Sequence, residues 1–201
     1  MKTKLLKSVA VAALAIAALP AAAADNSLTW QGVTFNTTVI DSNTLQLDIL
    51  NAATGATPNW SGINYIKAFE IKNIGALTSA SIFSGPGSFG ADLVHGLSAN
   101  VGCTTGGGGG ACFTGAPIAL TDNMSWTIDF TSGGALNFAL PHLKVQFLKD
   151  ALQDKATGDL LSQNIPLVPE PETYAMMLAG LGMVGAIARR RRSSEAPGTP
   201  A

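Results

Sequence analysis

The middle of the chain alternates hydrophobic and polar residues in short runs, which is typical of strands with one buried face. The clearest run covers residues 44–49, where Leu45, Leu47 and Ile49 share one face. The same alternation predicts further strands at residues 28–35, 65–72, 77–83, 126–130, 143–147 and 160–163. Because glycine, asparagine, serine and proline separate these runs, the pattern predicts an all-β body, folded as an antiparallel β-sandwich.

The alternation also predicts which side chains point into the core, because side chains along a strand face opposite sides in turn. In residues 65–72 we expect one face to carry Tyr65, Lys67, Phe69 and Ile71, and the other to carry Glu70 and Lys72. In two later strands we expect the inward residues to be Trp126, Ile128, Phe130, Leu143, Val145 and Phe147.

A continuous apolar run replaces the alternation at the N-terminus. Lys2 and Lys4 precede this run, residues 5–19, and Lys7 lies near its start. A small-residue A-x-A site follows it at residues 22–24. This order is typical of a secretory signal peptide, with cleavage expected between Ala24 and Asp25. The alternative is an uncleaved membrane anchor, for which the run is short.

A second apolar run, residues 174–188, lies near the C-terminus and is followed by Arg189, Arg190, Arg191 and Arg192. About 15 residues of helix would extend roughly 22 Å, against a hydrocarbon core of roughly 30 Å. We predict a single short transmembrane helix here, with snorkelling arginine side chains making up part of the difference. The arginines act as the stop and place this end in the cytoplasm, with the rest of the chain outside.

A stiff spacer, Val168, Pro169, Glu170 and Pro171, lies between the predicted body and this run. The prolines fix their own φ and push the preceding residues out of the α region, so the spacer is extended and suits a protease cleft. Spacer, apolar run and arginine block together closely resemble the PEP-CTERM sorting signal, also known as the ice-binding protein C-terminal domain. The resemblance covers residues 168–192.

The resemblance implies an exported protein whose tail is processed by an exosortase. Exosortases are integral-membrane cysteine transpeptidases of Gram-negative bacteria that make exopolysaccharide. Processing is expected at or near Pro169–Pro171, with the body in the periplasm until then and at the cell surface or outside afterwards. The expected partners are the Sec machinery, signal peptidase, the exosortase, the inner membrane transiently, and exopolysaccharide.

These features divide the chain into four segments. They are a signal peptide (1–24), an extracytoplasmic β-sandwich domain (25–167), the sorting signal (168–192) and a short cytoplasmic tail (193–201). The 201 residues include 12 basic and 13 acidic side chains, for a net charge of −1. Such a balance gives no basic surface for nucleic acid.

Two cysteines, Cys103 and Cys112, flank a run of five glycines. In an exported domain, two cysteines at short spacing favour a disulfide. The alternative is a metal site, which needs further ligands, and His95 and His142 are the two histidines available. We expect a disulfide, no metal and no cofactor.

The body shows no recognisable catalytic constellation. Residues 85–90 and 180–185 both match GxGxxG, but neither has the strand and helix context of a dinucleotide site. No sequence context couples His95 or His142 to a nucleophile or an orienting acid, so both are expected to be surface or loop histidines.

The sequence therefore favours a non-enzymatic, exosortase-processed protein of the cell surface or exopolysaccharide matrix. A secreted carbohydrate-binding module is the alternative, and it would need solvent-exposed aromatic rings from residues such as Trp30 or Trp60. A secreted hydrolase is less favoured. It would need His95 or His142 within hydrogen-bond reach of a carboxylate and a nucleophile.

Overall fold

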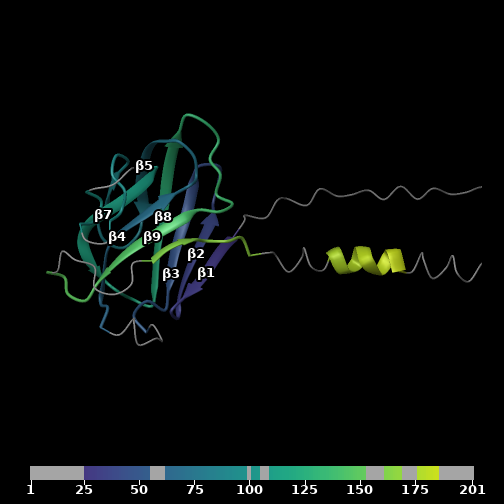
Figure 1. The fold of residues 1–201 in the computed structure, drawn as a ribbon, viewed down its shortest axis with the longest axis horizontal. Coiled ribbons are helices and arrows are strands. Elements are labelled where there is room, and N and C mark those ends of the chain that lie inside the picture. The colour runs from purple at the N-terminus through teal and green to yellow at the C-terminus, as the bar shows by residue number, and fades with distance from the viewer. Residues whose placement is uncertain are drawn as a thin grey trace, which may run out of the picture.

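Two antiparallel sheets account for most of the folded chain. The computed structural model describes residues 25–54, 62–98, 101–104, 109–152, 161–168 and 176–185. Within them, ten strands form two five-stranded sheets that face each other (Figure 1). The strand order is β1-β2-β3-β8-β5 in the first sheet and β10-β9-β4-β7-β6 in the second. The predicted antiparallel all-β body is confirmed.

The strands follow the chain in the order of their numbers. Their bounds are β1 (Asp25–Trp30), β2 (Val33–Val39), β3 (Thr44–Leu50), β4 (Tyr65–Lys72), β5 (Leu77–Ser84), β6 (Gly90–Asp92), β7 (Gly110–Ala119), β8 (Asn123–Ser132), β9 (His142–Leu148) and β10 (Leu161–Asn164).

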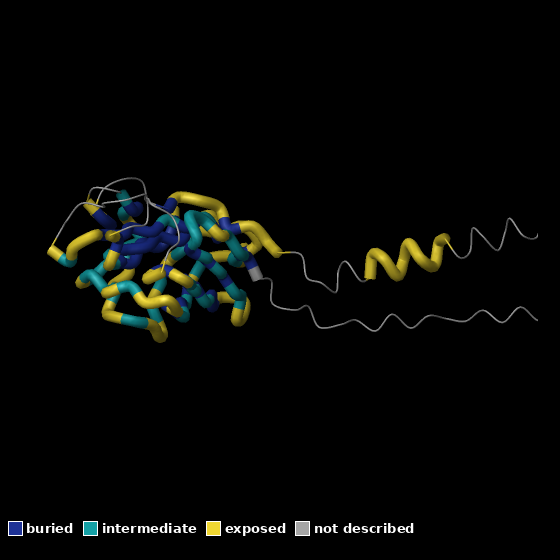
Figure 2. Tube along the Cα trace, turned by 90° about the horizontal axis from the view of Figure 1, so that it is seen from below, coloured by how far each residue is buried: buried dark blue, intermediate teal, exposed yellow. Residues whose placement is uncertain are grey.

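The core lies between the two sheets and contains the side chains that the alternation predicts. Leu45, Leu47 and Ile49 of β3 are buried, and so are the three predicted residues of β8 and the three of β9. At its centre, the ring centroid of Phe69 lies 5.0 Å from that of Phe113 and 5.2 Å from that of Trp126. These rings join β4 and β7 of one sheet to β8 of the other, so they hold the two layers together. Figure 2 shows the buried interior of the body.

Residues 28–35, predicted as one strand, instead form a tight hairpin between β1 and β2. Gln31 and Gly32 have φ values of 52° and 85°, and Trp30 pairs with Val33 across them. Two successive residues with positive φ make a two-residue turn whose twist matches that of the strands. The prediction was wrong because the hydrophobic alternation continues through the turn.

The predicted inner face of β4 is wrong at its first half. The pairing register shifts between Ile66 and Ala68, so Lys67 is the extra residue of a β-bulge. Ile66 therefore packs in the core, whereas Tyr65 and Lys67 do not. A bulge inserts one residue and reverses which parity points inward. Beyond it, Phe69 and Ile71 lie in the core as predicted.

Strand β7 has no counterpart among the predicted strands, because its glycines and Pro117 are typical of a loop. Its glycines are needed for close packing. A Cβ on Gly110 would lie 2.3 Å from the backbone oxygen of Ile71, and one on Gly115 would lie 2.4 Å from that of Ser88. The neighbouring backbone thus leaves no room for a side chain at either position.

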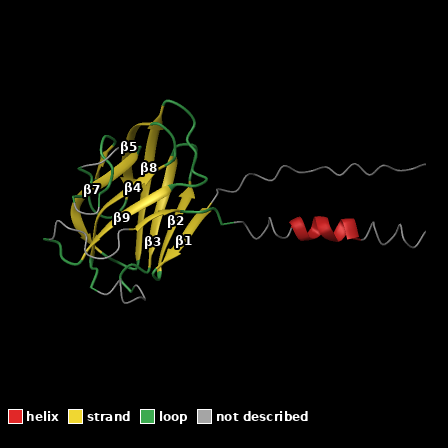
Figure 3. Cartoon of the chain, viewed as in Figure 1, coloured by secondary structure: helices red, strands yellow, loops and turns green. Residues whose placement is uncertain are grey.

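A short helix covers residues 176–185, inside the predicted membrane segment (Figure 3). All ten residues are exposed. No helix in the described part of the chain has the length and apolar character needed to cross a membrane. The predicted signal peptide and both ends of the predicted transmembrane run lie outside the described residues.

We expect Gly85→Ala to destabilise the fold strongly. Gly85 has a φ of 154°, and an added Cβ would lie 2.3 Å from an atom of the buried Trp126 indole. Backbone strain and overpacking together should lower the free energy of unfolding by about 2–4 kcal/mol. Gly90→Ala is the matched control, because an added Cβ there meets no atom within 4 Å. Equal unfolding midpoints in denaturant for the two variants would contradict this account.

Candidate functional site

The C-terminal end of the folded body is fixed against the first strand. The N–H of Ser27 donates to the backbone oxygen of Pro166 at 3.0 Å, and Asn26 forms an isolated antiparallel bridge with Leu167. Ile165 is fully buried in the core. The chain is therefore held in place as far as Leu167, and Val168, which is 48% exposed, is the last described residue before the spacer. We call this region, residues 25–27 with 165–168, the tail-exit end.

Asn26 ties this end to the loop between β8 and β9. Its side-chain amide donates to the backbone oxygen of Phe138 at 2.9 Å, and Asn26 itself is 1% exposed. The N–H of Ile165 donates to the backbone oxygen of Pro141 in the same loop at 2.9 Å. The start of β1 and the exit of the chain after β10 consequently lie side by side at one end of the sandwich (Figure 1).

The tail that leaves this end has a recognisable sequence. Residues 167–192 match the PEP-CTERM protein-sorting motif. No curated protein and no solved structure matches the chain. The predicted resemblance over residues 168–192 is confirmed, and the matched segment begins one residue earlier, at Leu167, which is paired with β1.

The PEP-CTERM motif indicates an exported protein that is targeted to an exosortase and processed at the membrane. Of the predicted site residues, Val168 is described and exposed. Pro169, Glu170, Pro171 and the four arginines, Arg189 to Arg192, lie outside the described residues. At the other predicted processing site, Asp25 begins β1 and Ala24 lies outside the described residues.

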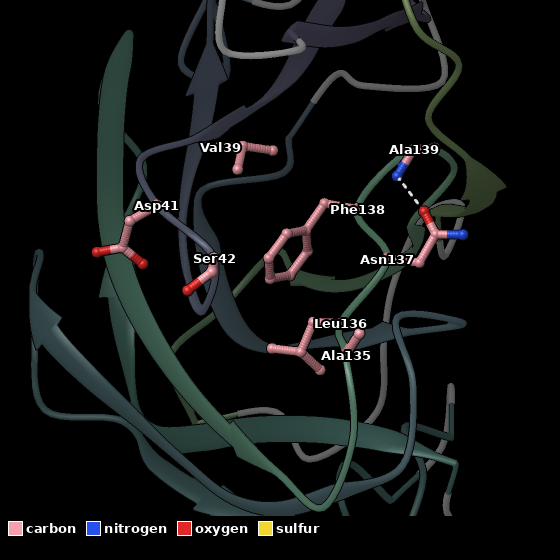
Figure 4. Close-up of a pocket in the computed structure, with 8 residues that line it drawn as sticks. All are labelled: Val39, Asp41, Ser42, Ala135, Leu136, Asn137, Phe138 and Ala139. Atoms are coloured by element: carbon pink, nitrogen blue, oxygen red, sulfur yellow. Dashed lines mark hydrogen bonds between the residues drawn. The ribbon is translucent and has the colours of Figure 1, made fainter. Parts of the chain in front are cut away.

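An open cavity of about 360 Å³ lies at the same end of the sandwich, between the β2–β3 turn and the β8–β9 loop (Figure 4). The ring of Phe138 lies between Val39 and Leu136, with Asp41 and Ser42 to one side. The Asn43 N–H and the Thr44 hydroxyl lower the pKa of Asp41 by hydrogen bonding to its carboxylate. Asp41 therefore stabilises the β2–β3 turn through these hydrogen bonds. The rest of the cavity lining is mainly apolar.

The predicted disulfide between Cys103 and Cys112 is confirmed, with a Cα–Cα distance of 5.8 Å. Cys112 is buried on β7, on the face of the second sheet that points away from the main core. Together with Ala68 and Leu97, the two cysteines form a small separate cluster. The disulfide therefore ties Cys103 to the outer face of this sheet, close to Leu97.

Next to Leu97 lies a buried ion pair that the sequence did not reveal. Glu70 is 1% exposed, and its Oε2 accepts hydrogen bonds from the N–H of Leu97 at 3.1 Å and from Lys144 Nζ at 3.2 Å. Lys144 Nζ also donates to the backbone oxygen of Leu97 at 3.3 Å. The alternation correctly predicted that Glu70 lies on the other face of β4 from Phe69 and Ile71. Its burial depends on a covering segment that alternation cannot predict.

His95 lies in the loop after β6, as predicted, and pairs with Asp92. Its Nδ1 lies 2.9 Å from Asp92 Oδ2, and its side chain is 44% exposed. Hydrogen bonds from the His95 side chain and backbone hold the pKa of Asp92 below its usual range. A histidine and a carboxylate are two members of a catalytic triad. The contacts recorded for the described residues give His95 no hydroxyl or thiol as a third.

His142 lies on β9 with its side chain on the outer surface of the sheet, in agreement with the expected surface position. Its Nε2 lies 3.2 Å from Ser162 Oγ, and its Nδ1 lies 2.8 Å from Asn164 Oδ1. This connectivity resembles that of a serine nucleophile, a histidine base and an orienting group. The sequence signal for this group was a serine and an asparagine two residues apart, Ser162 and Asn164. It becomes informative only when the pairing of β9 with β10 is known, because that pairing brings both residues next to His142.

The surroundings of His142 do not favour hydrolysis. Ser162 and Asn164 are exposed on the open face of an edge strand, where water reaches the serine. Asn164 can orient the imidazole, as asparagine does in Cys-His-Asn sites, but as a neutral amide it stabilises an imidazolium less than a carboxylate does. Lys72 pairs with His142 across the sheet, and its pKa is lowered by burial and by the charge of Lys144. His142, Ser162, Asn164 and Lys72 form a polar strip on the outer face of the sheet.

Two alternatives remained from the sequence, a metal site and a sugar-binding surface with exposed aromatic rings. Within them, no group of three or more histidine, cysteine, aspartate and glutamate side chains is placed to hold a metal ion. Trp126 is buried, and Trp30 is partly buried against the core. Trp60 lies outside the described residues.

We expect the Cys103→Ser, Cys112→Ser double variant to lose about 2.5–3 kcal/mol of unfolding free energy, because the bridge closes a short loop in the unfolded chain. Denaturant unfolding of the oxidised wild type, the reduced wild type and the double variant measures the effect. The reduced wild type is the internal control and should match the double variant. Two free thiols in the exported protein, by intact mass after alkylation, would be the contrary result.

Proposed function

We propose that this chain is an exosortase-processed, non-catalytic protein of the cell surface or exopolysaccharide matrix of a Gram-negative bacterium. The observation that carries the proposal is the PEP-CTERM motif at residues 167–192, directly after a folded β body. The chemistry belongs to the partner enzyme in this scheme, and the body is what the tail delivers. The predicted signal peptide, residues 1–24, starts the route through the Sec machinery and signal peptidase.

The tail-exit end brings the processing enzyme close to the body. Pro169 is two residues beyond Leu167, which is at most about 7 Å of extended chain. Residues 169–175 separate the last fixed part of the body from the helix at residues 176–185 and span at most about 25 Å. With the helix and the arginines held in the inner membrane, the body stays near the periplasmic surface until the tail is cut.

The position of the two chain ends supports the same route. β1 begins at Asp25, directly after the predicted signal peptide, and pairs through Asn26 with Leu167 of the sorting motif. The two hydrophobic segments therefore leave the body from one end. Both segments can therefore be in the same membrane while the body keeps one orientation. Export and tail insertion then require no rearrangement of the fold.

The body is proposed to bind or assemble, and not to catalyse. The Ser162–His142–Asn164 group has the connectivity of a triad, but it lies on an open face with a neutral orienting residue. A secreted carbohydrate-binding module remains the alternative. The burial of Trp126 and the packing of Trp30 against the core remove two of the rings that could stack on a sugar.

Replacing Pro169, Glu170 and Pro171 by alanine should stop tail processing. The variant should accumulate as a membrane-bound precursor, whereas the wild type loses its tail, because the enzyme reads an extended Pro-Glu-Pro segment. Intact mass and cell fractionation in an exosortase-competent host measure this. Alanines at Ser193 and Ser194, beyond the arginines, are the matched control and should leave maturation unchanged. A Pro-Glu-Pro variant that matures at the wild-type rate would contradict the proposal.

The non-catalytic part of the proposal has its own test at Ser162. We expect a fluorophosphonate probe, which labels activated serines covalently, to leave the exported protein unmodified, because the serine lacks a charged orienting partner and a closed site. Mass spectrometry of the treated protein measures this, with Ser162→Ala as control. Labelling of the wild type that disappears in Ser162→Ala would instead favour a hydrolase.

A further inference from the structure

The edges of the two sheets are protected unequally. Each sheet ends in two edge strands, namely β1 and β5 in the first and β10 and β6 in the second. Unpaired N–H and C=O groups on such edges can pair with another chain. β10 and β6 are short, with four and three residues. The first half of β1 is covered by residues 166 and 167.

Strand β5, residues 77–84, is the long edge. It has eight residues, and its only ladder in the described structure is with β8. Ala80 and Ile82 pack against the main core, which holds the strand in place. Because successive N–H and C=O groups of a strand point to either side, half of its backbone groups face away from β8. β5 is therefore a fixed row of hydrogen-bonding groups at the margin of the sheet.

The composition of β5 lacks the usual protection of an edge. Natural edges carry lysine or other charges, or proline, to prevent pairing. No charged residue occurs between Lys72 and Asp92, and β5 contains no proline. The register shifts near its two ends, at Leu77/Ser79 and Ile82/Ser84, are the one protective device that β5 carries, and they leave residues 79–82 in regular pairing with β8. Phe83, at the second shift, is 78% exposed.

We propose that β5 is a self-association surface, on which the β5 strand of a second copy pairs antiparallel. Two copies carry identical charges, so an edge can pair with itself only where like charges do not meet. The uncharged stretch of residues 73–91 meets this condition. The first sheet of one copy and the first sheet of the other then form one sheet of ten strands across a two-fold axis. Because this pairing uses both long edges, it closes at a dimer.

The test compares two lysine substitutions in the exported, mature protein. Ser81 and Ser125 are both exposed serines on the first sheet, and each faces an aspartate across a strand pair, Asp129 and Asp48 respectively. Ser81 lies on the β5 edge, whereas Ser125 lies on β8, which is paired on both sides. Ser81→Lys places two lysines near the two-fold axis, and Ser125→Lys does not.

We expect the wild type and Ser125→Lys to dimerise with rising concentration in sedimentation equilibrium. The dimer dissociation constant of Ser81→Lys should be raised by roughly tenfold or more. All three should unfold at similar temperatures, which shows that the body is intact. A mixture of Ser81→Lys with Ser81→Glu should restore the dimer, because the opposite charges then meet. A monomeric wild type, or a dimer equally stable in Ser81→Lys, would overturn the proposal. Neither residue lies in the sorting motif, so both variants should mature like the wild type and differ from it only in association.

Discussion

The burial of Trp126 between the two sheets is the contact on which the rest of the body depends. Its indole packs against Phe69 from the opposite layer and stacks on Phe89, and its Nε1 donates to the backbone oxygen of Pro86 at 3.1 Å. One side chain therefore holds the sheets together and fixes the chain where it crosses from β5 to β6. The close approach at Gly85 follows from it, since a Cβ added there would lie 2.3 Å from an atom of the indole.

The second sheet is unusual because its outer face is also partly buried. The segments that carry Leu97 and Cys103 lie on this face, and the buried Glu70 carboxylate is compensated by Lys144 and by the backbone N–H of Leu97. A buried charge without such partners would be costly, so the segment that carries Leu97 and the ion pair require each other. The disulfide acts on the unfolded chain and the hydrogen bonds on the folded one, and both favour the same closed arrangement.

The two ends of the body have different relations to other molecules. The tail-exit end joins the start of β1 to Leu167, the first residue of the sorting motif. The β5 edge lies at a lateral margin of the first sheet, where pairing with a second copy leaves the tail-exit end accessible. In the proposed scheme, delivery and assembly use separate parts of a small domain.

The sequence by itself determined the class of the fold, the disulfide and the sorting motif. Each rests on local information, namely the alternation in β3, β8 and β9, two nearby cysteines, and the linear order of residues 168–192. Only the tertiary structure decided the Gln31–Gly32 turn, the bulge at Lys67, the strand character of β7 and the burial of Glu70. These depend on which backbone lies opposite, as do the His142 contacts across β9 and β10 and the place of Leu167 beside β1. Alternation records which side of a strand is buried, but not which strand is its neighbour or what covers its other face.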